Sequence, residues 1–207
     1  MNPSGPAQRI VVAAVLVVGV LGGVLWRRAG GAEATHGRVA SARAAWARTW
    51  NGARLVDDGP PDPRDAALAL PRGWRVEAAR GRLRLAVSGM PVRCETWVLR
   101  AVPGSRRSPV RREVVAADAR TGPARVSVPI GATADSMLVT PAWAGRRETA
   151  DPAWLPAVRE RVARHEDLLS TLTIGDDRVV LLALDDPRPE TTVARAHLVR
   201  DIAATIG

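Results

Sequence analysis

One long apolar run, from Ile10 to Trp26, constrains this chain more than any other feature of its sequence. A helix of that length spans roughly 26 Å at about 1.5 Å per residue. This approaches the thickness of a bilayer's hydrocarbon core, which is roughly 30 Å. Trp26 and the flanking arginines Arg9, Arg27 and Arg28 are residues that anchor helices at membrane interfaces. The run therefore predicts a single transmembrane anchor over residues 10–28.

A cleaved signal peptide is the competing interpretation of the same run. Ala32-Glu33-Ala34 has the small-residue pattern of a cleavage site. However, Arg27 and Arg28 follow the apolar run directly, which is unusual before a cleavage site, and a retained anchor is preferred. More arginines follow the anchor than precede it, so the positive-inside tendency predicts that the body of the chain faces the cytoplasm. A body in the cell envelope, outside the membrane, is the alternative orientation.

Within the run, Gly19 and Gly23 form a GxxxG pair. Small residues at this spacing let two membrane helices approach closely and dimerise. Gly is also common in membrane helices for other reasons, which is the alternative explanation. The partners expected from the anchor are the lipid bilayer, a second copy of the chain, and an unidentified protein.

The composition gives information about source and excludes several function classes. All 30 basic residues are Arg, and Lys, Phe and Tyr, which have A/T-rich codons, are missing. This indicates a genome of high G+C content, so mutational bias explains much of the net charge of +9. Without Phe or Tyr to stack on bases, nucleic acid is not an expected partner. Without Lys, the chain cannot use a Walker-type or Schiff-base lysine.

The rest of the sequence predicts one α+β domain. Residues 32–50 are rich in Ala and Arg and predict a juxtamembrane helix with Trp46 and Trp50 on one apolar stripe. An interfacial helix on anionic lipid is one interpretation of this stripe, and a helix that docks its Trp residues on the domain is the preferred one. Residues 52–70 contain a dense Asp and Pro cluster and predict a solvated linker. Alternating patterns then predict strands at 82–87, 92–100, 111–117, 124–130 and 136–140. Short turns between these strands favour an antiparallel β-meander.

The pattern changes to a helical period at Asp151. Apolar positions and His165 recur every three or four residues from there to Leu172, which predicts an amphipathic helix. A hairpin or one interrupted strand is expected over 171–184, and a last helix over 190–206. The predicted division is a disordered flank at 1–9, the anchor at 10–28, a juxtamembrane helix and linker at 29–72, and an α+β domain at 73–207.

Few residues qualify as candidates for chemistry. Asp57 and Asp58 belong to an acidic group that offers oxygen ligands for a divalent ion, although its spacing is not that of a calcium loop. His165 lies on the predicted apolar face, where a core or subunit-contact histidine is the favoured interpretation. Cys94 is expected to be a buried, inert thiol in a strand. No catalytic, cofactor-binding or metal-binding residue is assigned from the sequence, and no cofactor is expected.

The order of these features resembles a loose class of uncharacterised bacterial single-pass membrane proteins. The matching parts are the anchor and its arginines, the Ala-rich helix, the strand pattern around 81–100 and the helix–strand–helix ending at Ile206. The resemblance implies a small α+β domain and no particular activity. We therefore expect a non-catalytic interaction or scaffold module; a metal-dependent enzyme that uses Asp57 and Asp58 or His165 is the alternative.

Overall fold

The computed structural model describes residues 41–50, 52–102, 109–122, 124–128, 138–141, 151–165, 168, 171–186 and 188–207. The chain divides into two compact units, residues 1–41 and residues 42–207. The description that follows concerns the second unit. The predicted anchor, with Arg9, Gly19, Gly23, Trp26, Arg27 and Arg28, lies outside the described residues.

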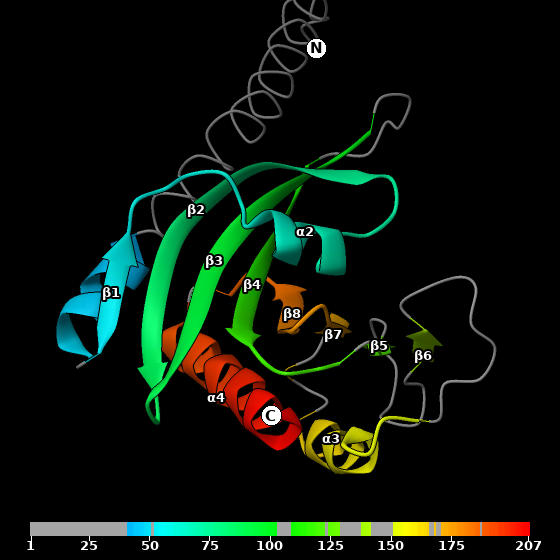
Figure 1. Cartoon of the computed structure of the whole chain (residues 1–207). Helices are drawn as coiled ribbons and strands as arrows, with labels where there is room; N and C mark the ends of the chain where they lie inside the picture. Colours follow the sequence, from blue (N-terminus) through cyan, green and yellow to red (C-terminus); the bar gives the residue numbers. More distant parts are fainter. Residues whose placement is uncertain are drawn as a thin grey trace, which may run out of the picture. The chain divides into compact units, whose positions relative to one another are not determined.

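The second unit is an α+β domain built on an antiparallel sheet (Figure 1). Its helices are residues 42–49, α2 (Pro63–Ala69), α3 (Leu155–Ala163) and α4 (Pro189–Ile206). Its first four strands are β1 (Ala53–Val56), β2 (Trp74–Val87), β3 (Met90–Ala101) and β4 (Val110–Asp118). The others are β5 (Ala124–Val128), β6 (Leu138–Pro141), β7 (Thr171–Gly175) and β8 (Arg178–Leu184).

The described strands form one eight-stranded sheet in the order β1-β2-β3-β4-β8-β7-β5-β6. The first four follow one another as a meander, as the sequence predicts. The predicted meander is wrong beyond β4, because the β7–β8 hairpin inserts between β4 and β5. The turn of that hairpin consists of Asp176 and Asp177, both with positive φ, which suits a tight two-residue hairpin turn.

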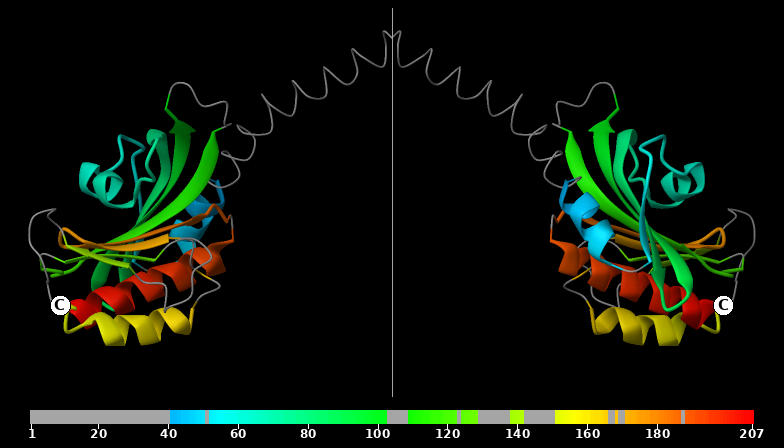
Figure 2. Two further views of the ribbon diagram at one scale, coloured as in Figure 1. Left: turned by 90° about the vertical axis from the view of Figure 1, so that its right-hand side faces the viewer. Right: turned by 90° about the vertical axis from the view of Figure 1, so that its left-hand side faces the viewer.

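The two faces of the sheet carry separate hydrophobic clusters, and Figure 2 shows helices on both of them. We call the face that packs against α3, α4 and residues 42–50 the helical face. Its strand residues include Leu85, Cys94 and Leu181, and Trp46 and Trp50 pack against the same cluster. The other face, which we call the α2 face, packs Leu68 and Ala69 of α2 against a second cluster of strand residues.

Alternation along β3 places neighbouring side chains on opposite faces, as expected for a strand buried on both sides. Val92 and Cys94 belong to the helical-face cluster, whereas Trp97 and Leu99 belong to the α2-face cluster. Val92 and Cys94 therefore share the helical face.

Segment 52–70 differs from its prediction as a solvated linker. Ala53–Val56 pairs with β2 as the first strand of the sheet, and Gly59 forms a further bridge to Ala79. Pro63–Ala69 is a helix with Asp62 as its N-cap: the side chain of Asp62 accepts a hydrogen bond from the amide of Arg64. Pro63 occupies the first helical turn, where the missing N–H costs nothing. The Asp and Pro cluster thus includes a helix start.

The helix predicted from Asp151 is shorter than its apolar period suggests. It begins at Leu155 and ends at Ala163, and its buried residues are Leu155, Val158 and Val162. Leu172 lies in β7 instead. The prediction that His165 belongs to the apolar face of this helix is wrong, because the helix ends before it and its side chain is exposed.

Candidate functional site

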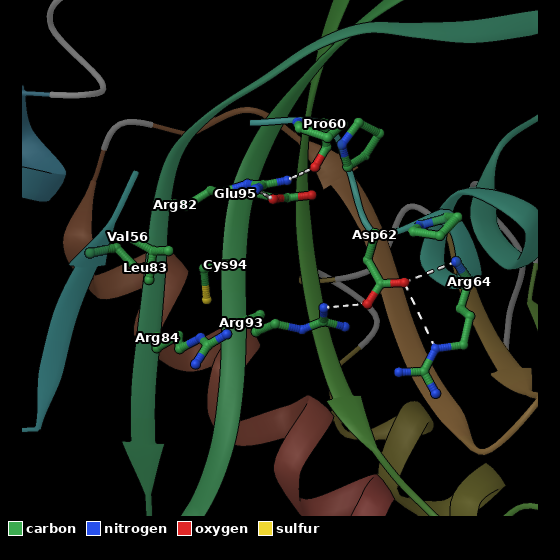
Figure 3. Close-up of a pocket in the computed structure, with 12 residues that line it drawn as sticks. Val56, Pro60, Asp62, Arg64, Arg82, Leu83, Arg84, Arg93, Cys94 and Glu95 are labelled. Carbon is green, nitrogen blue, oxygen red and sulfur yellow. Dashed lines mark hydrogen bonds and ion pairs between the residues drawn. The ribbon is translucent and has the colours of Figure 1, made fainter. Parts of the chain in front are cut away.

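A hollow of about 520 Å³ lies on the α2 face of the sheet (Figure 3). Its floor is formed by residues 82–84 of β2 and 93–95 of β3. Its wall is the segment 60–64, which crosses from the edge of β2 to α2, and Val56 of β1 lines it from the sheet edge. Volumes of this size accommodate small organic ligands. We call this feature the α2-face hollow.

The wall of the hollow is fixed by contacts at both of its ends. Asp58 accepts a hydrogen bond from the amide of Gly81 at 2.8 Å, at a bulge where Gly81 adopts a positive φ of 59°. The Pro60 carbonyl then accepts a hydrogen bond from Arg82 on the floor. Pro60, Pro61 and Pro63 restrict the backbone between these points, because each proline ring fixes φ.

One charged pair on the floor is satisfied within the protein. Arg82 Nε donates to Glu95 Oε2 at 2.6 Å, with both side chains mostly buried. The indole N–H of the fully buried Trp97 donates to the other oxygen of Glu95. Glu95 therefore has partners on both oxygens and holds Arg82 against the strand.

A second group of charges joins α2 to the sheet beside the hollow. Arg93 of β3 donates to Asp62 at 2.7 Å and to Asp65 at 2.8 Å. Arg178 of β8, which is almost fully buried, lies 3.3 Å from Asp65, 3.2 Å from Asp62 and 3.1 Å from Asp118. Two arginines and three aspartates thus attach a seven-residue helix to β3, β4 and β8.

Burial and pairing shift the pKa values of these acids in opposite directions. Burial raises the pKa of Asp65 to about 6, against the opposing effect of Arg93. Burial also acts to raise the pKa of Asp62, but hydrogen bonds from the Arg93 side chain and the Arg64 backbone outweigh it and lower that pKa. Asp62 is the more exposed of the two and stays ionised.

The register of the sheet brings three arginines side by side, and two of them, Arg84 and Arg93, line the hollow. Arg54 of β1 is directly opposite Arg84 of β2, and Arg84 is directly opposite Arg93 of β3. Figure 3 draws Arg84 and Arg93 next to each other on the floor. Directly paired residues on neighbouring strands point to the same face and lie close together. We call Arg54, Arg84 and Arg93 the arginine row.

The helical face holds a separate buried network centred on Glu113 of β4. This carboxylate is fully buried and accepts hydrogen bonds from Arg43 at 2.7 Å, from Thr192 at 2.6 Å and from Arg195. Arg43 also donates to Thr96 at 2.8 Å and to the Gly81 carbonyl at 3.2 Å. These contacts join residues 42–49, β2, β3, β4 and α4, and all donors point into the protein, so we assign them a structural role.

The residues suggested by the sequence as metal or catalytic candidates do not come together. Asp57 and Asp58 are exposed, and Asp58 caps the Gly81 amide as described above. Within the described ranges, no group of three or more His, Cys, Asp or Glu side chains is arranged to hold a metal ion. Cys94 is a free, buried cysteine, and burial raises the pKa of its thiol. The prediction of a buried thiol in a strand is confirmed.

The acidic pairs at the ends of β8 serve local structure. Asp177 accepts a hydrogen bond from the Thr121 amide at 3.2 Å, and Asp186 pairs with Arg188 at 2.6 Å, which lowers the pKa of Asp186. Asp185 accepts a hydrogen bond from Thr96 at 3.0 Å. Asp176 and Asp177 thus lie in the hairpin turn, and Asp185 and Asp186 lie in the segment between β8 and α4.

The α2-face hollow was missed by sequence reasoning. In the sequence, its arginines are part of a general surplus of positive charge, and the residues of α2 lie in a segment whose composition predicts a linker. The one local signal was Asp62-Pro63, a helix N-cap followed by proline at the first helical position. The arginine row had no local signal, because its members come from three strands.

In the part of the chain that the structure describes, no helix is long and apolar enough to cross a membrane. No family model, no curated protein and no solved structure matches the chain. The geometry of the α2-face hollow and the sequence of the predicted anchor are the two features of the chain that bear on its function.

Proposed function

We propose that this chain is a membrane-anchored, non-catalytic interaction module that binds its ligand in the α2-face hollow. The observation that carries the proposal is the way the hollow is built. Its wall is fixed at Asp58 and at α2, and Arg82 and Arg93 on its floor are held by Glu95, Asp62 and Asp65. A site whose side chains are already ordered loses little entropy on binding.

The distribution of titratable groups supports binding over catalysis. A general base or nucleophile has to present a free, suitably ionised group to the substrate. The two carboxylates that line the hollow, Asp62 and Glu95, are both engaged by arginines. Cys94 contributes to the lining, yet its thiol belongs to the cluster on the helical face. Ion-paired carboxylates of this kind position arginines rather than move protons.

Ligand screening by NMR tests the proposal. The full chain, labelled with ¹⁵N in detergent micelles, is titrated with a small library of anionic, neutral and cationic fragments. We expect shifts that concentrate on the amides of Val56, Asp62, Arg64, Arg84 and Arg93, and fragments recovered unchanged after prolonged incubation. Shifts scattered over the surface, or no shifts with any fragment, would contradict the binding site. Conversion of a fragment would contradict the non-catalytic role.

The membrane location is a second part of the proposal and rests on the sequence of residues 10–28. The apolar run and its excess of arginines on the C-terminal side support an anchor with the domain facing the cytoplasm. Fusions of alkaline phosphatase and of a fluorescent protein after Gly207 test this orientation. We expect fluorescence in the membrane fraction and no phosphatase activity. Phosphatase activity would place the domain in the cell envelope instead.

A further inference from the structure

The arginine row carries more positive charge than the described part of the protein neutralises. Arg93 is paired with Asp62 and Asp65. Arg54 and Arg84 are exposed, and neither forms a hydrogen bond or ion pair within the described residues. Like charges placed directly opposite each other on neighbouring strands destabilise a sheet. The register therefore imposes an energetic cost at the edge of the hollow that no acid of the described chain offsets.

The β2–β3 hairpin contains a second pair of opposed arginines, and this pair is partly neutralised. Arg75 of β2 is directly opposite Arg100 of β3, which is also a like-charge pair. There, Glu77 accepts hydrogen bonds from Arg100 at 3.0 Å on both carboxylate oxygens. The protein thus provides an acid where an arginine pair faces solvent away from the hollow. At the hollow, the acids are used for Arg93 and Arg178, and Arg54 and Arg84 are left over.

We propose that the arginine row binds an oxyanion, a phosphate or carboxylate group, of a small organic ligand that occupies the α2-face hollow. This inference rests on the binding role proposed above and names the chemistry of the ligand. Neighbouring strands lie about 4.8 Å apart, so two guanidinium groups on adjacent strands can share one oxyanion. The planar guanidinium matches the geometry of phosphate and carboxylate oxygens.

The remaining lining indicates how the rest of the ligand is held. Arg64, at the start of α2, lies on the wall and is largely exposed, and its nearest carboxylate oxygen, on Asp62, is 3.9 Å away. It can contribute a third cation to a second anionic group. Val56, Pro60 and Pro61 provide apolar surface for the non-ionic part of the ligand. Charge and apolar surface together favour an organic anion over a simple inorganic ion.

Calorimetric titration of the full chain in a non-ionic detergent tests this assignment. The probes are pyrophosphate, citrate and dihexanoylphosphatidylglycerol, a short-chain lipid below its micellar concentration, all at low ionic strength because salt screens exposed charges. We expect Arg84→Gln to weaken binding about tenfold or more, the loss typical of one hydrogen bond to a charged group. Arg54→Gln should weaken it severalfold. Arg75→Gln, which removes an exposed arginine of the same strand, is the matched control and should change affinity less than twofold.

A second measurement separates loss of binding from loss of structure. Without any probe and at low salt, Arg84→Gln should raise the melting temperature, because it removes repulsion from Arg54 and Arg93. A variant that binds poorly because it is misfolded would melt lower. Tighter binding of the lipid probe than of the soluble anions identifies a lipid headgroup as the source of the oxyanion, and the reverse order identifies a soluble ligand.

Three outcomes would overturn the inference in distinguishable ways. Equal losses of affinity for the anions in Arg84→Gln and Arg75→Gln would show that the anions respond to net charge and not to the arginine row. If neutral fragments occupy the hollow in the NMR screen while none of the three anions binds, the oxyanion assignment is wrong and the proposed binding role stands. If nothing binds in either experiment, both are wrong.

Discussion

At the scale of single residues, Glu113 is the charge whose removal should disturb the domain most. It is fully buried and accepts hydrogen bonds from Arg43, Arg195 and Thr192. Breaking a buried ion pair by removing one partner costs about 3–5 kcal/mol, because the other charge is left in a poorly solvated site. The guanidinium groups of two almost fully buried arginines depend on this one carboxylate.

We therefore expect Glu113→Gln to lower the free energy of unfolding by about 3–5 kcal/mol. Urea denaturation followed by tryptophan fluorescence measures this change. Glu77→Gln is the matched control, since it removes an exposed partner of Arg100 in the same sheet and should cost about 1 kcal/mol or less. A cost for Glu113→Gln no larger than that of the control would contradict the structural role of the network.

Asp65 should make stability depend on pH in a definite direction. Its folded-state pKa is raised to about 6, compared with about 3.9 in an unfolded chain. Between these values the folded state retains the proton and the unfolded state releases it. The contribution of Asp65 is therefore fully present below about pH 4 and is lost as the pH rises through 6.

Comparison of the wild type with Asp65→Asn isolates this contribution. The difference in unfolding free energy between the two proteins should fall by about 3 kcal/mol from pH 4 to pH 7, as two pKa units imply. Asp62, whose pKa is lowered, contributes stability that is fully present above about pH 4 and is lost only as the pH falls below that value, outside this window. A difference that stays constant, or that grows with pH, would show that Arg93 and Arg178 outweigh burial at Asp65.

At the scale of elements, α2 should be the part of the hollow most easily loosened. It has seven residues, too few to be stable as an isolated helix, and it depends on Leu68, Ala69 and the pairs made by Asp62 and Asp65. Leu68→Ala should lower the free energy of unfolding by about 2–5 kcal/mol, the range for truncating a buried leucine. Native-state hydrogen exchange should give residues 60–70 a smaller opening free energy than α4, in the wild type as well as in Leu68→Ala.

Ala67→Ser provides the control for this experiment, because Ala67 lies on the exposed side of the same helix. It should change stability by about 0.5 kcal/mol or less. Equal opening free energies for residues 60–70 and α4 would indicate that α2 unfolds only together with the sheet. That result would contradict its description as a separately loosened wall.

Elements with a strong local pattern were predictable, and those defined by partners far along the chain were not. The alternation in Arg82–Val87 predicted a strand with Leu83 and Leu85 facing the core, and both are buried on the helical face. By contrast, β1 has four residues and becomes a strand only by pairing with β2. The position of β8 beside β4 depends on contacts between residues sixty or more positions apart, which no local period encodes.

The candidate site was less predictable than the fold for the same physical reason. Each member of the arginine row is an ordinary arginine in its own strand, and only the register of three strands places them opposite one another. His165 shows the reverse error. Its spacing from Val158 and Val162 suggested a core position, but the helix ends at Ala163, and sequence patterns fix helix ends least well.

At the scale of the whole molecule, residues 42–207 form one of two compact units. Both hydrophobic clusters consist of residues from Trp46 onward. The helix at 42–49 contributes Trp46 and Trp50 to the larger cluster, and Arg43 binds Glu113. This helix therefore belongs to the folded domain, which confirms the preferred interpretation that its Trp residues dock there, although the predicted division at residue 73 groups it with the membrane-proximal segment.

Two truncations test this boundary. A chain of residues 42–207 should unfold cooperatively in urea with a midpoint close to that of the full chain, and it should leave the membrane fraction if residues 10–28 are the anchor.

A chain of residues 52–207 lacks Arg43, Trp46 and Trp50, so it leaves Glu113 without one of its arginines and exposes part of the helical-face cluster. Its stability should be lower by about 3 kcal/mol or more. Equal stability of the two truncations would show that residues 42–51 are not part of the folded domain, and a membrane-bound 42–207 chain would show that a segment other than the apolar run provides attachment.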